Sequence, residues 1–211
     1  MPALKLGRGT IAMLFIVRSD DRPDGYAVLS TATQWEGWLG GNIPDLMDNE
    51  IRRRLMSNLK HLLVGLELKA ALIDPHENRG PDGRPMLFES YFQNLIQEFC
   101  VGVSSVIEGL GSAHWLAQNG ENGADVRPIY RNQWKPALLA VYDDQGQLGL
   151  GDAVEQTLAV RDKLHQDQLG ARENIDWHTF SYDGAFIPAK NAISTLLLRG
   201  ANAVPETTNL R

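Results

Sequence analysis

The chain has 211 residues, of which 43% are hydrophobic and 22% charged, the proportions of an ordinary globular protein of one or two domains. A net charge of −6 excludes a broad non-specific surface for nucleic acid and leaves room only for a local basic cleft. The single cysteine, Cys100, excludes an internal disulfide and a cysteine-based zinc site and is typical of a reducing compartment, so we expect a cytoplasmic protein.

The N-terminal segment predicts neither a leader nor a membrane anchor. Residues 1–9 lack the apolar core and small-residue cleavage site of a signal peptide. The apolar run TIAMLFIV at Thr10–Val17 is far shorter than a membrane-spanning helix. The strong turn signal at residues 20–25 and the strand-like composition of Tyr26–Thr33 then predict a β-hairpin, with a helix over Thr10–Val17 as the alternative. Residues 35–41 are expected to be a linker with two tryptophan anchors.

Two long helices are predicted in the middle of the chain. Apolar residues recur at helical spacing from Pro44, placed in a first turn, to about Leu72. A loop with three prolines, residues 74–85, separates this segment from a helix over Met86 to about Ala117. Three glycines predict that the second helix either contacts a neighbour closely or breaks: Gly102, Gly109 and Gly111.

Shorter helices are predicted over Gln133–Tyr142, from an N-cap at Asp152, and over Phe186–Arg199 with Pro188 in its first turn. The fold class is therefore mainly α, an up-and-down helical bundle with a small N-terminal β-hairpin. We expect three parts: an N-terminal appendage at residues 1–41, the helical bundle at residues 42–199, and a loose C-terminal tail at residues 200–211.

The segment from Asp152 to Asp167, DAVEQTLAVRDKLHQD, carries the strongest indication of function. At about 100° per residue its apolar side chains fall on one half of a helix and most of its polar ones on the other. Arg161 and His165, four residues apart, lie on the apolar half. Because burying an unpaired guanidinium costs several kcal/mol, this pair either is held by a structural ion pair or serves a site. Three carboxylates of the long helices are candidate partners: Glu89, Glu98 and Glu108.

Other reactive side chains have structural explanations. We expect His61 to be half-buried, His114 to pack at a helix end, Cys100 to act as a small buried hydrophobe, and Arg52–Arg54 to form a solvated face. No Glu-x-x-His pair and no phosphate-binding glycine loop occur in the sequence. No metal and no cofactor are therefore expected.

The predicted helix order, with Arg161-Asp162-Lys163-Leu164-His165 on the penultimate helix and Asp183 in the loop before a final apolar helix, resembles the HEPN superfamily. The likeness in helix order covers residues 45–199, and its specific part is the five-residue segment. It implies an all-α bundle, often a metal-independent RNase of toxin, phage-defence or RNA-processing systems. The family motif has four to six residues between Arg and His, whereas three separate Arg161 from His165.

The resemblance implies Arg161 and His165 as catalytic residues, with Asp162 in support. His165 would take the 2′-hydroxyl proton, since imidazole titrates near neutral pH, and Arg161 would bind the phosphate. It also implies a homodimer in which two copies of the motif share a cleft, RNA as substrate, and an antitoxin or other partner protein. The alternative function is a non-catalytic helical module that binds a partner protein or a small ligand.

Overall fold

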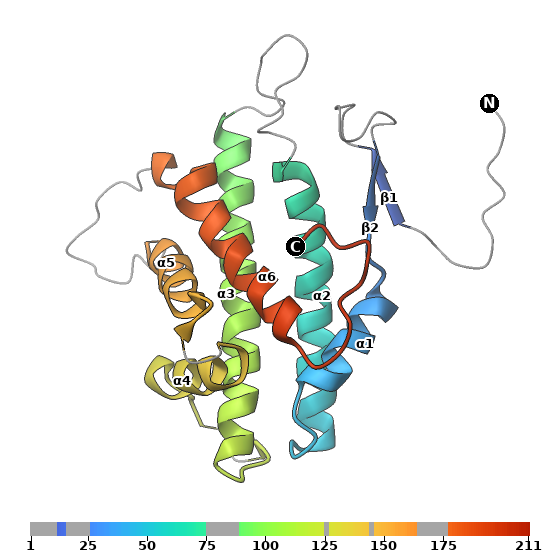
Figure 1. The fold of residues 1–211 in the computed structure, drawn as a ribbon, viewed down its shortest axis with the longest axis vertical. Helices are drawn as coiled ribbons and strands as arrows, with labels where there is room; N and C mark the ends of the chain where they lie inside the picture. Colours follow the sequence, from blue (N-terminus) through green and yellow to red (C-terminus); the bar gives the residue numbers. More distant parts are fainter. Residues whose placement is uncertain (1–11, 16–25, 75–88, 125–126, 144–145, 164–176) are drawn as a thin grey trace, which may run out of the picture.

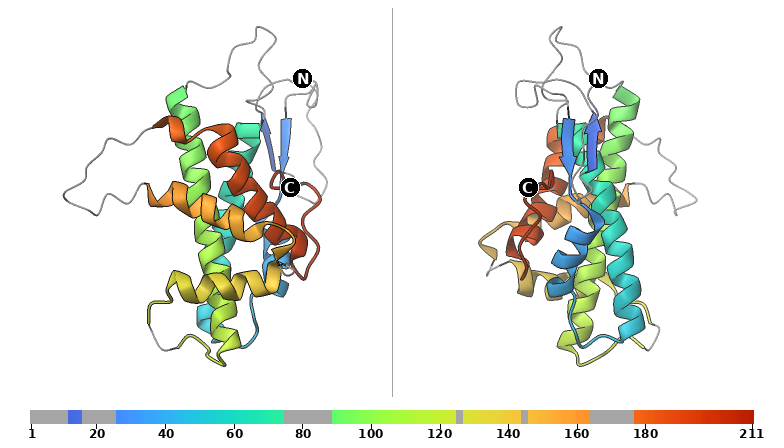
Figure 2. Two further views of the ribbon diagram at one scale, coloured as in Figure 1. Left: turned by 60° about the vertical axis from the view of Figure 1, so that its left-hand side comes forward. Right: turned by 90° about the vertical axis from the view of Figure 1, so that its right-hand side faces the viewer.

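The computed structural model describes residues 12–15, 26–74, 89–124, 127–143, 146–163 and 177–211. Its helices are α1 (Ala32–Asn42), α2 (Asn49–Ile73), α3 (Glu89–Gln118), α4 (Arg131–Tyr142), α5 (Leu150–Asp162) and α6 (Ile187–Arg199). The mainly α bundle is confirmed (Figure 1). The long helices α2 and α3 lie antiparallel, and the shorter α4 and α5 run across α3 (Figure 2).

A two-stranded antiparallel sheet precedes the helices, as predicted. Strand β1 (Ala12–Phe15) pairs with β2 (Tyr26–Leu29), and Ala12 lies opposite Leu29. The alternative of a helix in this region is therefore wrong for the residues that the structure describes. Strand β2 is shorter than the predicted Tyr26–Thr33, because Thr31 caps the helix that follows.

Helix α1 occupies the segment that was predicted to be a linker. The Thr31 hydroxyl accepts from Gln34 N, and the Gln34 side chain accepts from Thr31 N, which forms a capping box. Trp35 and Trp38 follow at helical spacing and are fully buried. The linker prediction is wrong because capping and the burial of two tryptophans outweigh the glycines of the segment. The prediction that the tryptophans anchor it to the core is confirmed.

The two long helices form as predicted, apart from the start of the first. Helix α2 begins at Asn49 rather than at Pro44, because Asp48 Oδ1 accepts from the backbone N of Glu50 and Ile51 at 2.9 and 3.2 Å. Helix α3 is unbroken, and its glycines allow neighbouring helices to pack closely against it. A Cβ atom at Gly102 or Gly109 would lie 3.0 or 2.9 Å from leucine side chains of α2.

The start of α5 also differs from the prediction. Its N-cap is Gly149, which adopts a φ of 64°, and Asp152 lies within the first turn. Asp143 accepts from the backbone N of Leu148 and Gly151 at 3.2 and 3.3 Å. A carboxylate from the end of α4 therefore takes the capping role assigned to Asp152. Helix α6 has its proline in the first turn, as predicted.

One hydrophobic core joins the segments that were expected to be separate. It includes Trp35 and Trp38 of α1, the bundle helices, and Val204 and Leu210 near the C-terminus. The amide of Asn209 donates to Val28 O at 2.9 Å. The expectation of a loose tail is wrong, because these contacts hold residues 201–211 against the rest of the chain. The core crosses both of the expected boundaries, after residues 41 and 199.

A buried polar network connects α1, α3 and α4. His114 Nε2 lies 3.2 Å from the Tyr142 hydroxyl, which donates to Asn42 Oδ1 at 3.3 Å. The same Asn42 oxygen accepts from Ala201 N at 2.9 Å. Burial lowers the pKa of His114, because it disfavours the charged imidazolium, and a hydrogen bond to the Asn42 backbone opposes this shift. The packing role predicted for His114 is confirmed.

This network predicts a loss of stability in mild acid. Below the ordinary histidine pKa of about 6.5 the unfolded chain binds a proton that the folded chain binds less readily, so stability falls as the pH falls. The urea midpoint of the parent should decrease from about pH 7.5 to about pH 5.5 more steeply than that of His114→Gln, which has no imidazole. Parallel pH dependences in the two proteins would contradict the assignment to His114.

Candidate functional site

Helix α5 presents the apolar face that its sequence predicts. Val154 and Thr157 are fully buried, and Leu158 is 1% exposed. These side chains join the core, where α5 packs against α3 and α6. Arg161 and Asp162 form the last turn of the helix. Because the apolar face of α5 is buried, the helix is held in place and its C-terminal end carries Arg161 and Asp162 at the surface.

Arg161 lies between two carboxylates. Its Nη2 is 3.8 Å from Glu108 Oε2 on α3, and its Nη1 is 3.2 Å from Asp162 Oδ1. The structure thus selects Glu108 among the three candidate partners, since Glu98 pairs with Lys69 and the side chain of Glu89 lies outside the described part. The Arg161 side chain is 30% exposed. This guanidinium is therefore held in place without being sealed in the core.

The third predicted site residue, His165, lies outside the described residues. Arg161 and Asp162 are brought together, with a hydrogen bond between them. The described chain breaks off at Lys163 and resumes at Trp177. The geometry of the site therefore rests on Arg161, Asp162 and the groups that surround them.

The site includes a second group of charges that sequence reasoning missed. Asp162 Oδ2 lies 3.2 Å from Arg131 Nη1 on α4. Arg131 and Lys135, four residues apart on α4, both pair with Glu155 of α5. The pKa of Glu155 is lowered, first by the hydrogen bond from Lys135 and also by Arg131, against a smaller opposing effect of burial. The i, i+4 spacing of Arg131 and Lys135 could have predicted from the sequence that they share one basic face of a helix.

This arrangement orients Arg161 without engaging all of its hydrogen-bond donors. Each carboxylate engages a different terminal nitrogen, although a guanidinium carries five N–H donors. Within the described chain its Nε has no hydrogen-bond partner. Donor groups of this partly exposed guanidinium therefore remain available to a further acceptor.

Most of the remaining candidates have the structural roles predicted for them. Cys100 is fully buried, and burial raises the pKa of its thiol to about 12, which makes it unreactive. Arg54 pairs with Glu50 at the surface, as predicted. Arg52 differs from the predicted solvated face, because its side chain is 23% exposed and its Nη2 donates to Gly40 O and Ile43 O as well as pairing with Asp45. His61 is exposed rather than half-buried, because it points outward from α2, with Nδ1 2.6 Å from Ser57 O.

Within the described ranges, no cluster of histidine, cysteine and carboxylate side chains has the arrangement of a metal site. Of the helices that the structure describes, none combines the length and apolar character needed to cross a membrane. Comparison of the chain with protein-family models, curated proteins and solved structures finds no match.

Proposed function

We propose that this protein is an RNA-binding effector of the HEPN type that cleaves RNA without a metal ion, acting as a homodimer. The observation that carries the proposal is the placement of Arg161, which is oriented by Glu108 and Asp162 yet 30% exposed. Its two carboxylates engage the terminal nitrogens, and a guanidinium with five N–H donors then has donors left for a phosphate.

In the proposed reaction Arg161 binds the scissile phosphate and stabilises its developing charge. His165 takes the proton of the 2′-hydroxyl, whose oxygen then attacks the phosphorus and expels the 5′-oxygen of the next nucleotide. The products are a 2′,3′-cyclic phosphate and a 5′-hydroxyl, whose oxygen takes its proton from water. Asp162 supports the site by holding the guanidinium of Arg161 on one side and that of Arg131 on the other. The protein contributes a base, a cation and the carboxylate that holds this cation, and none of these steps calls for a metal ion.

The proposal predicts cleavage of single-stranded RNA in the presence of EDTA. His165→Ala should reduce the rate by about a hundredfold or more, the usual contribution of a general base. Arg161→Ala should reduce both the rate and the affinity for RNA. Arg54→Ala is the matched control, because it removes an exposed, ion-paired arginine on α2 and should leave both unchanged.

The measurement is the cleavage rate of an end-labelled RNA, with circular dichroism of each variant to show that it is folded. Equal rates for the parent and a folded His165→Ala would remove His165 from the mechanism. A parent that cleaves no RNA would favour the second candidate, a non-catalytic module for a partner protein such as an antitoxin. The ion pairs of Arg161 with Glu108 and Asp162 are the observation that favours that candidate.

A further inference from the structure

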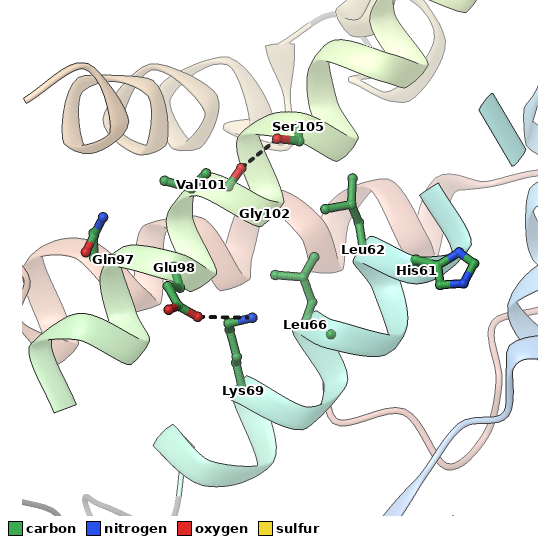
Figure 3. A pocket seen from close by; sticks show the side chains of 10 residues that line it. His61, Leu62, Leu66, Lys69, Gln97, Glu98, Val101, Gly102 and Ser105 are labelled. Carbon is green, nitrogen blue, oxygen red and sulfur yellow. Dashed lines mark hydrogen bonds and ion pairs between the residues drawn. The ribbon is translucent and has the colours of Figure 1, made fainter. Parts of the chain in front are cut away.

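We infer that the outer face of α2 and α3 is a self-association surface on which a second copy of this chain docks with two-fold symmetry. The two helices enclose a groove of about 300 Å³ with Leu62, Leu66 and Val101 on its walls. Figure 3 looks onto this groove, with α6 lying behind the helix pair. In the right-hand view of Figure 2, α2 and α3 likewise form the side of the molecule away from α6.

The groove combines small residues with partly exposed apolar ones. Gly65 lies in its wall, and a Cβ atom there would meet only Lys69 Nζ, at 3.9 Å. Leu62 of α2 and Val101 of α3, which also line the groove, are half-buried. A covering helix could approach closely at the glycine and remove the neighbouring apolar side chains from water, which favours association.

The charges on this face of one copy can pair with the charges on the same face of a second copy. Lys69 of α2 and Glu98 of α3 lie across the groove from each other, 3.4 Å apart and partly exposed (Figure 3). A two-fold axis parallel to the helices lays α2 of one copy over α3 of the other. Each Lys69 then faces the partner's Glu98, and every neighbouring pair among the four helices is antiparallel, the arrangement of an up-and-down four-helix bundle.

The size of the face also fits a second copy of the chain. Helix α2 has 25 residues, which corresponds to a length of about 37 Å. Two helices side by side are about 20 Å wide, so the face offers about 700 Å² of surface. This is close to the roughly 800 Å² that each partner contributes to a standard stable interface.

The docking surface rests on the proposed function, which expects a homodimer, and it adds where the two copies meet. Glu108, the partner of Arg161, follows Val101 by seven residues and so lies on the same outward stripe of α3. Docking through this face therefore places Arg161 at the rim of the interface in each copy.

The test is sedimentation velocity of the full chain without RNA, at high micromolar concentration. The parent should sediment with twice the chain mass of 23.4 kDa. Lys69→Glu and Glu98→Lys should each be monomeric, because like charges then meet across the two-fold axis. An equimolar mixture of the two variants should form a heterodimer, since each charge then faces its opposite. A monomeric parent, or a mixture that stays monomeric, would overturn the inference.

Gly65→Arg provides an independent test, because it fills the groove where the monomer has room for a side chain. It should yield a folded monomer, whereas Gly37→Arg, at an exposed glycine of α1 with open space around it, should remain a dimer. A dimeric Gly65→Arg would overturn the assignment of this face. Cleavage is measured on the same samples. A monomeric parent that still cleaves RNA overturns the docking surface and the proposed homodimer but leaves the proposed reaction standing, and a dimer without activity overturns only the proposed reaction.

Discussion

Replacing Gly111 by alanine is expected to lower the free energy of unfolding by about 1–3 kcal/mol, the usual cost of overpacking. A Cβ atom at Gly111 of α3 would lie 2.8 Å from the backbone oxygen of Trp134 and 2.9 Å from its ring. Trp134 belongs to α4 and is 2% exposed. Because the obstructing atom belongs to the backbone of a packed helix, α3 and α4 must separate to admit even one methyl group.

The matched control is Gly37→Ala in α1, where the added Cβ atom has no neighbour within 4 Å. That change should raise the free energy of unfolding by about 0.5–1 kcal/mol, since alanine is the better helix former. Urea unfolding of both variants measures the difference. A Gly111→Ala protein as stable as Gly37→Ala would show that α3 and α4 do not approach each other as closely as the structure has them.

The elements that could be predicted from the sequence are those with strong local patterns. Three features were predicted from neighbouring residues alone: the periodic leucines of α2, the apolar face of α5 and the proline at the start of α6. None of them depends on contacts with distant parts of the chain. Helix α1 was missed because its glycines indicated a linker, whereas its stability depends on Trp35 and Trp38 being buried in a core formed by distant segments. The start of α5 was misplaced because the carboxylate that accepts from the backbone N of its first turn belongs to Asp143, at the end of α4.

In the candidate site, too, contacts between neighbours in the sequence could be predicted, whereas contacts between different helices could not. The sequence places Arg161 beside Asp162 on one helix end, and the structure confirms this neighbourhood. Which carboxylate of the long helices reaches Arg161 depends on how α5 crosses α3, and the amphipathic pattern predicts only that the two helices pack. For the same reason Arg131, which reaches Asp162 from α4, could not be assigned to the site in advance.

Replacing Glu67 by alanine is expected to lower the free energy of unfolding by about 2–4 kcal/mol, through unmade hydrogen bonds and a cavity. Glu67 lies on α2 and is fully buried. Its carboxylate accepts from Ser30 N and from the Ser30 hydroxyl, both at 2.9 Å. The Ser30 hydroxyl also lies 3.2 Å from that of Thr207. This side chain therefore joins the end of the hairpin, the long helix and the C-terminal segment.

Two comparisons separate this effect from the loss of a charge on α2. Glu50→Ala removes an exposed glutamate that pairs with Arg54 and should cost no more than about 1 kcal/mol. Glu67→Gln keeps a carbonyl oxygen for Ser30 N and should cost less than Glu67→Ala, because fewer buried groups lose their partners. Urea unfolding at neutral pH gives all three values. Equal losses for Glu67→Ala and Glu50→Ala would mean that the buried carboxylate does not hold these three segments together, and that the C-terminal segment is bound by its apolar contacts alone.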